Sequence, residues 1–302
     1  MRNKTFMTWM AGIATVVTMA VAGSANAGGG VSGPAPQGRT RGIPDIILAQ
    51  NAVASADWYF PTQTSVPVTA NGVIWLQRDG ASSTSSFARL ATEIARQTNS
   101  IVVAPKFRSL DKPGASVDGT ALAQAVAQLF VGDRVALNNS ATAAGNQGPL
   151  PEKFLIVGLG KGAGFATSVG AFTVDNGAAA NLLGIVMIDG IVKDDQFAPS
   201  LAKLDSIGIP DYLIAGPYRG ASKARRRTAE LLSLLHPDEF VGIQMPLKGR
   251  DAVIAVSVGW INDIYGGYGP TDPRYGIYGS PNDGTYVTGQ PIMIGRTKGK
   301  VL

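Results

Sequence analysis

The chain has 302 residues, no cysteine, one histidine and a formal net charge of +5. This length is sufficient for one large domain with a substantial core. The lack of cysteine excludes disulfides, thiolate metal sites and cysteine nucleophiles, and the weak, dispersed positive charge argues against a nucleic-acid-binding protein. Because one histidine and scattered carboxylates give no ligand spacing, we expect no metal and no cofactor.

Residues 1–27 have the pattern of a secretory signal peptide. Arg2 and Lys4 precede an apolar run, and residues 24–27 (SANA) match a small-residue cleavage site. We therefore expect a mature protein that starts at Gly28, carries a net charge of +3, and is secreted or associated with the cell envelope without a stable membrane span. An uncleaved N-terminal anchor is the alternative, although the apolar run is short for a spanning helix.

Residues 28–56 are predicted to be a flexible start followed by a lead-in segment with weak helical periodicity. Residues 57–61 are predicted to form an early edge strand that ends at its proline. Beyond them, continuous apolar runs typical of buried strands alternate with segments that carry an apolar helical face. In chain order these are strand 71–77, helix 86–97, strand 101–105, helices 118–131 and 133–144, strand 154–157, helix 165–172, strands 182–189 and 210–216, helix 222–235, strand 240–245 and helix 251–265.

The apolar runs separated by helix-length segments predict a mostly parallel central sheet with helices on both faces, a three-layer α/β sandwich over residues 57–265. Right-handed connections then place the carboxyl ends of the parallel strands, and any site, along one edge. Residues 266–302 are rich in glycine and tyrosine and are predicted to be an extension packed on this domain.

A glycine-rich turn divides residues 153–167 (KFLIVGLGKGAGFAT). An apolar strand leads into glycines at positions 158, 160, 162 and 164, and a helix is predicted to follow from Phe165. Glycine suits a sharp strand-to-helix turn because the turn demands positive φ and leaves no room for a Cβ. In α/β proteins this geometry places a reactive group or an anion.

The pentapeptide Gly158-Leu159-Gly160-Lys161-Gly162 resembles the nucleophile elbow of α/β-hydrolases, G-x-S-x-G, with glycine at the position of the serine. Residues 76–80 (LQRDG) resemble the oxyanion loop of secreted actinobacterial α/β-hydrolase-like proteins, which typically reads LQHG. Residues 181–190 (NLLGIVMIDG) and 259–267 (GWINDIYGG) are also similar to that group. The resemblance covers about residues 57–279 and implies an α/β-hydrolase-like fold.

The resemblance also implies a serine nucleophile, a histidine after the last strand and a carboxylate that orients it, and the chain departs from this pattern. Gly160 occupies the nucleophile position, and residues 246–251 (PLKGRD), after the last strand, contain no histidine. His236 precedes that strand at the end of a helix, where it suits the helix dipole. Asp189 stands where the orienting carboxylate would lie. We therefore expect a degenerate site without catalytic residues.

The backbone of this degenerate site is expected to persist as an oxyanion-like pocket that binds an unidentified small molecule or envelope component. Its donors are N–H groups at Lys161 and near residues 79–81. The residues expected to line it are Arg78, Asp79, Gly80, Ala81, Gly158, Leu159, Lys161 and Gly162. The chain is thus predicted to be a non-catalytic, exported protein of the α/β-hydrolase type.

The residues also admit other interpretations. A divergent secreted esterase or lipase-like acyl hydrolase would use a serine at position 82, 83, 85 or 86 with Lys161. A dinucleotide enzyme would use the loose fingerprint Gly158-x-Gly160-x-x-Ala163, although Asp175 downstream falls in an apparent loop.

A third interpretation is an interaction module of the envelope, whose tyrosine-rich residues 266–302 face a partner. The basic cluster at residues 223–227 is interpreted as a solvated helix face, with an anionic cell-surface partner as the alternative.

Overall fold

The computed structural model describes most of the chain between residues 38 and 295. The described residues are 38–40, 45–47, 53–61, 69–78, 84–107, 119–216, 223–237, 240–245, 250–267 and 292–295. The expected signal peptide, its cleavage site and most of the 266–302 extension lie outside them. Among the described residues, no helix is long and apolar enough to cross a membrane.

The described strands form one 10-stranded sheet in the order β1-β3-β5-β4-β6-β7-β8-β9-β10, with β2 also paired to β3. Its centre is parallel, which confirms the predicted sheet type. The parallel strands are β4 (Val73–Gln77), β5 (Ile101–Phe107), β6 (Phe154–Leu159), β7 (Leu182–Ile188), β8 (Asp211–Ala215) and β9 (Phe240–Gln244). The antiparallel strands are β1 (Gly38–Thr40), β2 (Asp45–Ile47), β3 (Val53–Phe60) and β10 (Ile292–Gly295).

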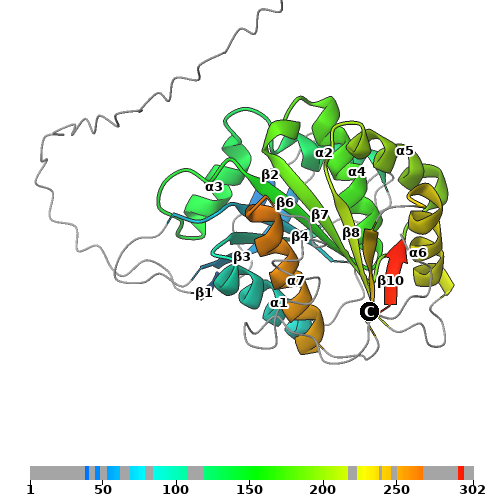
Figure 1. The fold of residues 1–302 in the computed structure, drawn as a ribbon. Helices are drawn as coiled ribbons and strands as arrows, with labels where there is room; N and C mark the ends of the chain where they lie inside the picture. Colours follow the sequence, from blue (N-terminus) through cyan, green and yellow to red (C-terminus); the bar gives the residue numbers. More distant parts are fainter. Residues whose placement is uncertain are drawn as a thin grey trace, which may run out of the picture. The chain divides into compact units, whose positions relative to one another are not determined.

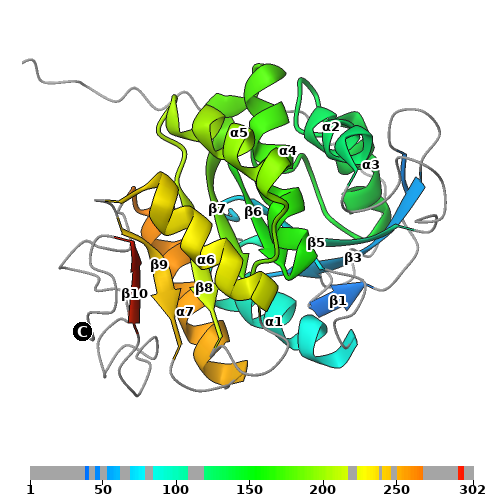
Figure 2. The same ribbon diagram turned by 90° about the vertical axis from the view of Figure 1, so that its right-hand side faces the viewer.

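Helices cover both faces of the sheet, as the three-layer prediction requires (Figure 1, Figure 2). Residues of β6 alternate between the two sides: Phe154 and Ile156 pack with one set of helices, whereas Leu155 and Val157 pack with the other. The first set is α2 (Thr120–Gln128), α3 (Val135–Ala143), α4 (Lys161–Asp175), α5 (Asp194–Asp205) and α6 (Lys223–Leu235). The second set is α1 (Thr84–Gln97) and α7 (Arg250–Tyr265).

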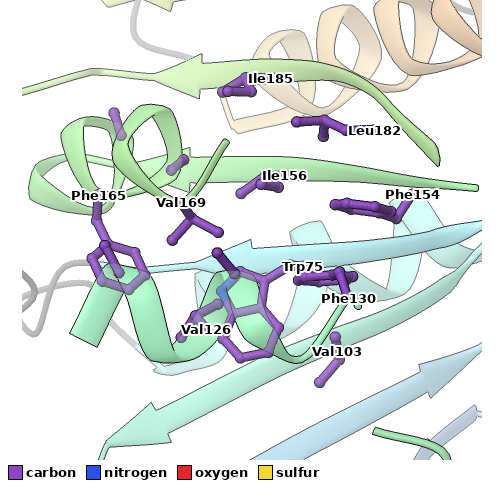
Figure 3. Close-up of a cluster of buried hydrophobic side chains, with 14 of the residues drawn as sticks. Trp75, Val103, Val126, Phe130, Phe154, Ile156, Phe165, Val169, Leu182 and Ile185 are labelled. Atoms are coloured by element: carbon purple, nitrogen blue, oxygen red, sulfur yellow. The ribbon is translucent and has the colours of Figure 1, made fainter. Parts of the chain in front are cut away.

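Aromatic rings pack between β4, β6 and the segment after α2 (Figure 3). The rings of Phe130 and Phe154 are stacked with centroids 4.0 Å apart, and the indole of Trp75 meets Phe130 edge-on at 6.1 Å. Each such pair contributes about 0.5–1.5 kcal/mol beyond its buried area. The buried indole N–H of Trp75 donates to Oε1 of Gln77 at 3.3 Å. This packing supports β4 beside β6, the two strands whose carboxyl ends carry the predicted site.

Several elements differ from the sequence prediction. The described part of residues 41–56 is not helical, because β2 and the start of β3 pair there as antiparallel strands. The strand predicted at 57–61 is not at an edge, since β3 has β1 and β2 on one side and β5 on the other. Helix α4 begins at Lys161 rather than at Phe165, and α5, which contains Pro199, lies in a stretch with no predicted helix.

One carboxyl group is buried between α4 and the sheet. Asp211 begins β8, and its Oδ2 accepts a hydrogen bond of 2.6 Å from Oγ1 of Thr167. Its Oδ1 has no hydrogen-bond partner among the described residues. Burial raises the pKa of Asp211 to about 8, an effect that the Thr167 bond opposes and the negative charge of Asp205 increases. Asp211 is therefore mostly protonated in the folded protein at pH 7.

Replacement of Asp211 by Asn is expected to change how the free energy of unfolding depends on pH. The folded protein binds this proton more tightly than the unfolded chain. The contribution of Asp211 to the free energy of unfolding therefore falls by up to about 1.4 kcal/mol per pH unit between about pH 4 and pH 8. D211N removes this slope, and its stability relative to wild type should therefore rise with pH over that interval.

Urea titrations at several pH values measure this difference, with D133N, at an exposed carboxylate, as the matched control. Parallel pH profiles for wild type and D211N would show that Asp211 does not hold its proton in the folded protein.

Candidate functional site

A sharp turn joins β6 to α4 at the carboxyl edge of the parallel strands. Its apex is Gly160, which has φ 55° and ψ −122° and directly precedes Lys161, the first residue of α4. These angles belong to the first central position of a type II′ turn, which favours glycine. The N–H of Gly160 donates to the carbonyl of Ile188 at 3.0 Å, and its carbonyl accepts from the N–H of Ile191 at 2.9 Å. The apex is therefore tied to the end of β7 and to the loop that follows it.

The glycines on either side of the apex are required by backbone packing. A Cβ on Gly158 would overlap the carbonyl oxygen of Gly162 and lie 2.5 Å from Cα of Ala163. A Cβ on Gly162 would lie 2.5 Å from the carbonyl oxygen of Gln77. Both positions are well inside van der Waals contact with main-chain atoms, which cannot rotate aside as a side chain can. The first turn of α4 thus lies directly on the ends of β6 and β4.

Other residues predicted on this edge lie around the turn. Arg78 follows β4, is half-buried, and places its guanidinium carbon 5.8 Å from the ring centroid of Phe87, a cation–π geometry. Leu159 ends β6 and is half-buried, while Lys161 is exposed. The first N–H groups of a helix have no acceptor within it, so the start of α4 presents donors and a partial positive charge. The described residues do not include Asp79, Gly80 and Ala81.

Asp189 links neighbouring strands. It follows β7 with φ 51°, and its Oδ1 accepts a hydrogen bond of 2.6 Å from the N–H of Gly216, just past β8. Its Oδ2 lies 3.9 Å from Nη1 of Arg225 on α6. The half-exposed carboxylate therefore holds the end of β7 to the β8–α6 connection, which is a structural contact.

The single histidine of the chain lies at the opposite edge of the sheet. Helix α6 starts on the side where β8 ends and runs back to the side where β9 begins, and His236 follows its last residue (Figure 2). Nε2 of His236 lies 3.4 Å from Oδ2 of Asp205, the last residue of α5. The two edges are separated by a strand length, about 16 Å for the 5 residues of β8. No imidazole is therefore within reach of Gly160.

The residues of the alternative enzyme interpretations lie elsewhere. Ser85 and Ser86 are in the first turn of α1 and reach solvent, and the serines at 82 and 83 are outside the described residues. Asp175 ends α4 and forms an ion pair with Lys203 at 2.6 Å. Where the chain is described, no group of three or more His, Asp or Glu side chains is placed to hold a metal ion.

A groove of about 280 Å³ opens beside the turn, between α2, α4 and α5. Helix α4 lies between the other two on this face of the sheet (Figure 2). Of the residues predicted to line a pocket, Lys161 borders this groove. Other residues around it include Thr120, Phe165, Phe172, Val192, Lys193 and Phe197. The groove therefore combines aromatic walls with basic side chains.

Sequence reasoning missed most of this groove because it did not predict α5. A signal was available, since Phe197, Leu201 and Leu204 recur at positions i, i+4 and i+7 and are all buried. Pro199, inside the helix, obscured that pattern because proline removes a backbone donor and usually interrupts a helix. The residues that α2 contributes reach the groove through tertiary packing, which leaves no local signal.

Alanine at Gly158 in β6 or Gly162 in α4 is expected to destabilise the fold, although alanine in a strand or helix is normally more stable than glycine by about 0.5–1 kcal/mol. Each new Cβ must displace main-chain atoms, and overpacking of this kind costs about 1–3 kcal/mol or more. G164A is the matched control, because a Cβ on Gly164 would meet its nearest neighbours at 3.3 Å, where small movements suffice.

Urea unfolding of the three variants measures these differences. Equal stability of G162A and G164A would mean that the first turn of α4 does not rest on the end of β4.

No protein-family model matches this chain, and no curated protein matches it. Solved structures do share its fold. A fungal esterase from Rhizomucor miehei has a TM-score of 0.50 and 11% identity, over 78% of this chain and 86% of the esterase. A hyperthermophilic esterase from the archaeon Pyrobaculum calidifontis has a TM-score of 0.50 and 14% identity, over 76% of this chain and 85% of the esterase. At such low identity the likeness concerns the fold alone: the chain has the α/β-hydrolase fold, which confirms the predicted fold class.

Proposed function

We propose that this chain is an exported ligand-binding protein that uses the α/β-hydrolase fold without a serine–histidine–aspartate triad. The observation that carries the proposal is Gly160, which stands at the apex of the strand-to-helix turn where the hydrolase fold presents its serine. Glycine has no hydroxyl with which to attack an acyl carbon, so the first covalent step of serine hydrolysis lacks its nucleophile.

The position of the histidine supports the same proposal. A general base must lie within about 2.6–3.2 Å of the proton that it takes. His236 instead pairs with Asp205 at the far edge of the sheet, and Asp189 accepts a hydrogen bond from Gly216. Loss of triad members lowers the rate of a serine hydrolase by about 10⁴- to 10⁶-fold. The geometry therefore favours binding over turnover.

The features that persist at the turn suit an anionic or polar ligand. The start of α4 presents main-chain donors, and Lys161 and Arg78 add positive charge nearby. The proposed export to the cell envelope rests on residues 1–27. The proposed kinship with secreted actinobacterial proteins rests on motifs such as residues 76–80. The partner is a small molecule or an envelope component rather than a nucleic acid, because the positive charge is weak and dispersed.

Assays of the purified protein with p-nitrophenyl esters of short and medium acyl chains test the proposal. We expect hydrolysis no faster than the background from a mixture of free amino acids, and no change in Lys161→Ala or His236→Ala variants, because neither side chain has a nucleophile to activate. A saturable rate that disappears in K161A, or on alanine substitution of the serines at 82, 83, 85 and 86, would replace this proposal with the divergent ester hydrolase.

Serine at the apex provides a second test. G160S restores the missing hydroxyl but supplies no imidazole, so we expect no burst of p-nitrophenol and no turnover. A side chain at φ 55° and ψ −122° is strained by about 1–3 kcal/mol, and both G160S and its matched control G160A should lose stability of that order. A p-nitrophenol burst in G160S, absent in G160A, would show that a base is already positioned at the turn.

A further inference from the structure

The groove beside the turn has a continuous floor on one side of α4. Lys161, Gly164, Phe165, Ser168 and Phe172 line it, and their spacing of three, four, seven and eleven positions from the first places them along one helical stripe. At 1.5 Å per residue the floor extends about 16 Å along the helix. It is basic at its first position and aromatic further along.

Helix α5 and the loop before it form a second wall. Val192, Phe197 and Pro199 border the groove there, and α2 adds Ala123 on the opposite side. Gly164 leaves space in the groove next to this wall because it has no side chain. A Cβ there would lie 3.3 Å from the carbonyl oxygen of Ile191. Of these apolar side chains, Phe172 and Val192 are half-buried and Pro199 is exposed, whereas Phe165 and Phe197 are almost fully buried. A ligand with an apolar body gains by covering the first three.

Positive charge gathers where α4 and α5 begin. Lys161 is the first residue of α4, Lys193 directly precedes α5, and both are exposed and line the groove. Asp195 also lines it, so the two lysines and one carboxylate sum to +1 among the described residues. Helices α2, α4 and α5 all start at this groove without a side-chain cap, and the positive ends of their dipoles add to the same field. A single negative charge complements this end.

The volume limits the size of the ligand. About 280 Å³ holds roughly nine water-sized groups of about 30 Å³ each. This space accommodates a short apolar chain with a small head group, and it is too small to enclose a dinucleotide.

We propose that this groove binds a small amphipathic monocarboxylate. The carboxylate lies between Lys161 and Lys193, and the apolar chain follows α4 past Val192 and Pro199 toward Phe172. This assignment rests on the proposed ligand-binding function and names the chemical class of its ligand. It places that ligand over α4, beside the turn at Gly160.

Titration calorimetry of the purified protein with octanoate tests the assignment, since octanoate has about ten non-hydrogen atoms and matches the volume. We expect saturable binding of one octanoate per chain that weakens as salt is raised from 20 to about 300 mM. Octanamide, which has the same chain without the charge, should bind at least about 5-fold more weakly.

Substitutions locate the bound ligand. Lys161→Gln and Lys193→Gln should each weaken octanoate binding about 2- to 5-fold, and Asp195→Asn should strengthen it about 2-fold. Lys203→Gln is the matched control for charge, because Lys203 lies on α5, pairs with Asp175 and is not part of the groove. Ser200→Trp should fill the groove and abolish binding.

Ser206→Trp, at an exposed serine just past α5, is the control for the bulky substitution and should bind like wild type. Circular dichroism verifies that each variant is folded. Absence of octanoate binding, or binding that S200W leaves intact, would overturn the assignment to this groove, and equal affinity for octanamide would overturn the carboxylate. None of these results alters the proposal that the chain lacks triad catalysis, which the ester-hydrolysis assays test separately.

Discussion

The close approach of main chains at the start of α4 organises the candidate site. Gly158 and Gly162 let the first helical turn rest on the ends of β6 and β4 with no side chain between them. This contact constrains the direction in which α4 leaves the sheet. The apex residue of the turn, Gly160, has a positive φ. Because the contact involves main-chain atoms, the turn forms without a reactive group on the residue at its apex. The geometry of this turn therefore does not depend on a reactive side chain at its apex.

The distribution of charge follows from the direction of the parallel strands. Helices that follow β6, β7 and β8 begin at one edge of the sheet, so Lys161, Lys193 and Arg225 gather there with the positive ends of the helix dipoles. The same helices end at the other edge, where His236 meets Asp205. One edge is therefore suited to hold an anion, while the only imidazole of the chain stands a strand length away.

Much of this fold was predictable because strands such as β6, buried on both faces, read as continuous apolar runs. β2 was missed because residues 41–56 mix apolar and polar positions without a period of two. The start of α4 was missed because glycine disfavours a helix, whereas contact with Gln77 demands glycine at Gly162. The sharp strand-to-helix turn was predictable from the local spacing of the glycines. The groove was not, since Phe165 and Phe197 come from different helices and meet only through tertiary packing.

The central claim is that the chain has no serine activated by a triad. Intact-mass spectrometry after treatment with a fluorophosphonate tests this claim most directly, because the reagent phosphonylates activated serine hydroxyls of serine hydrolases whatever ester they prefer. With glycine at the apex of the turn and no imidazole opposite, the chain should keep its unmodified mass under conditions that fully label a serine esterase treated in parallel. A stoichiometric adduct of one phosphonyl group per chain, mapped to a single serine, would contradict the account.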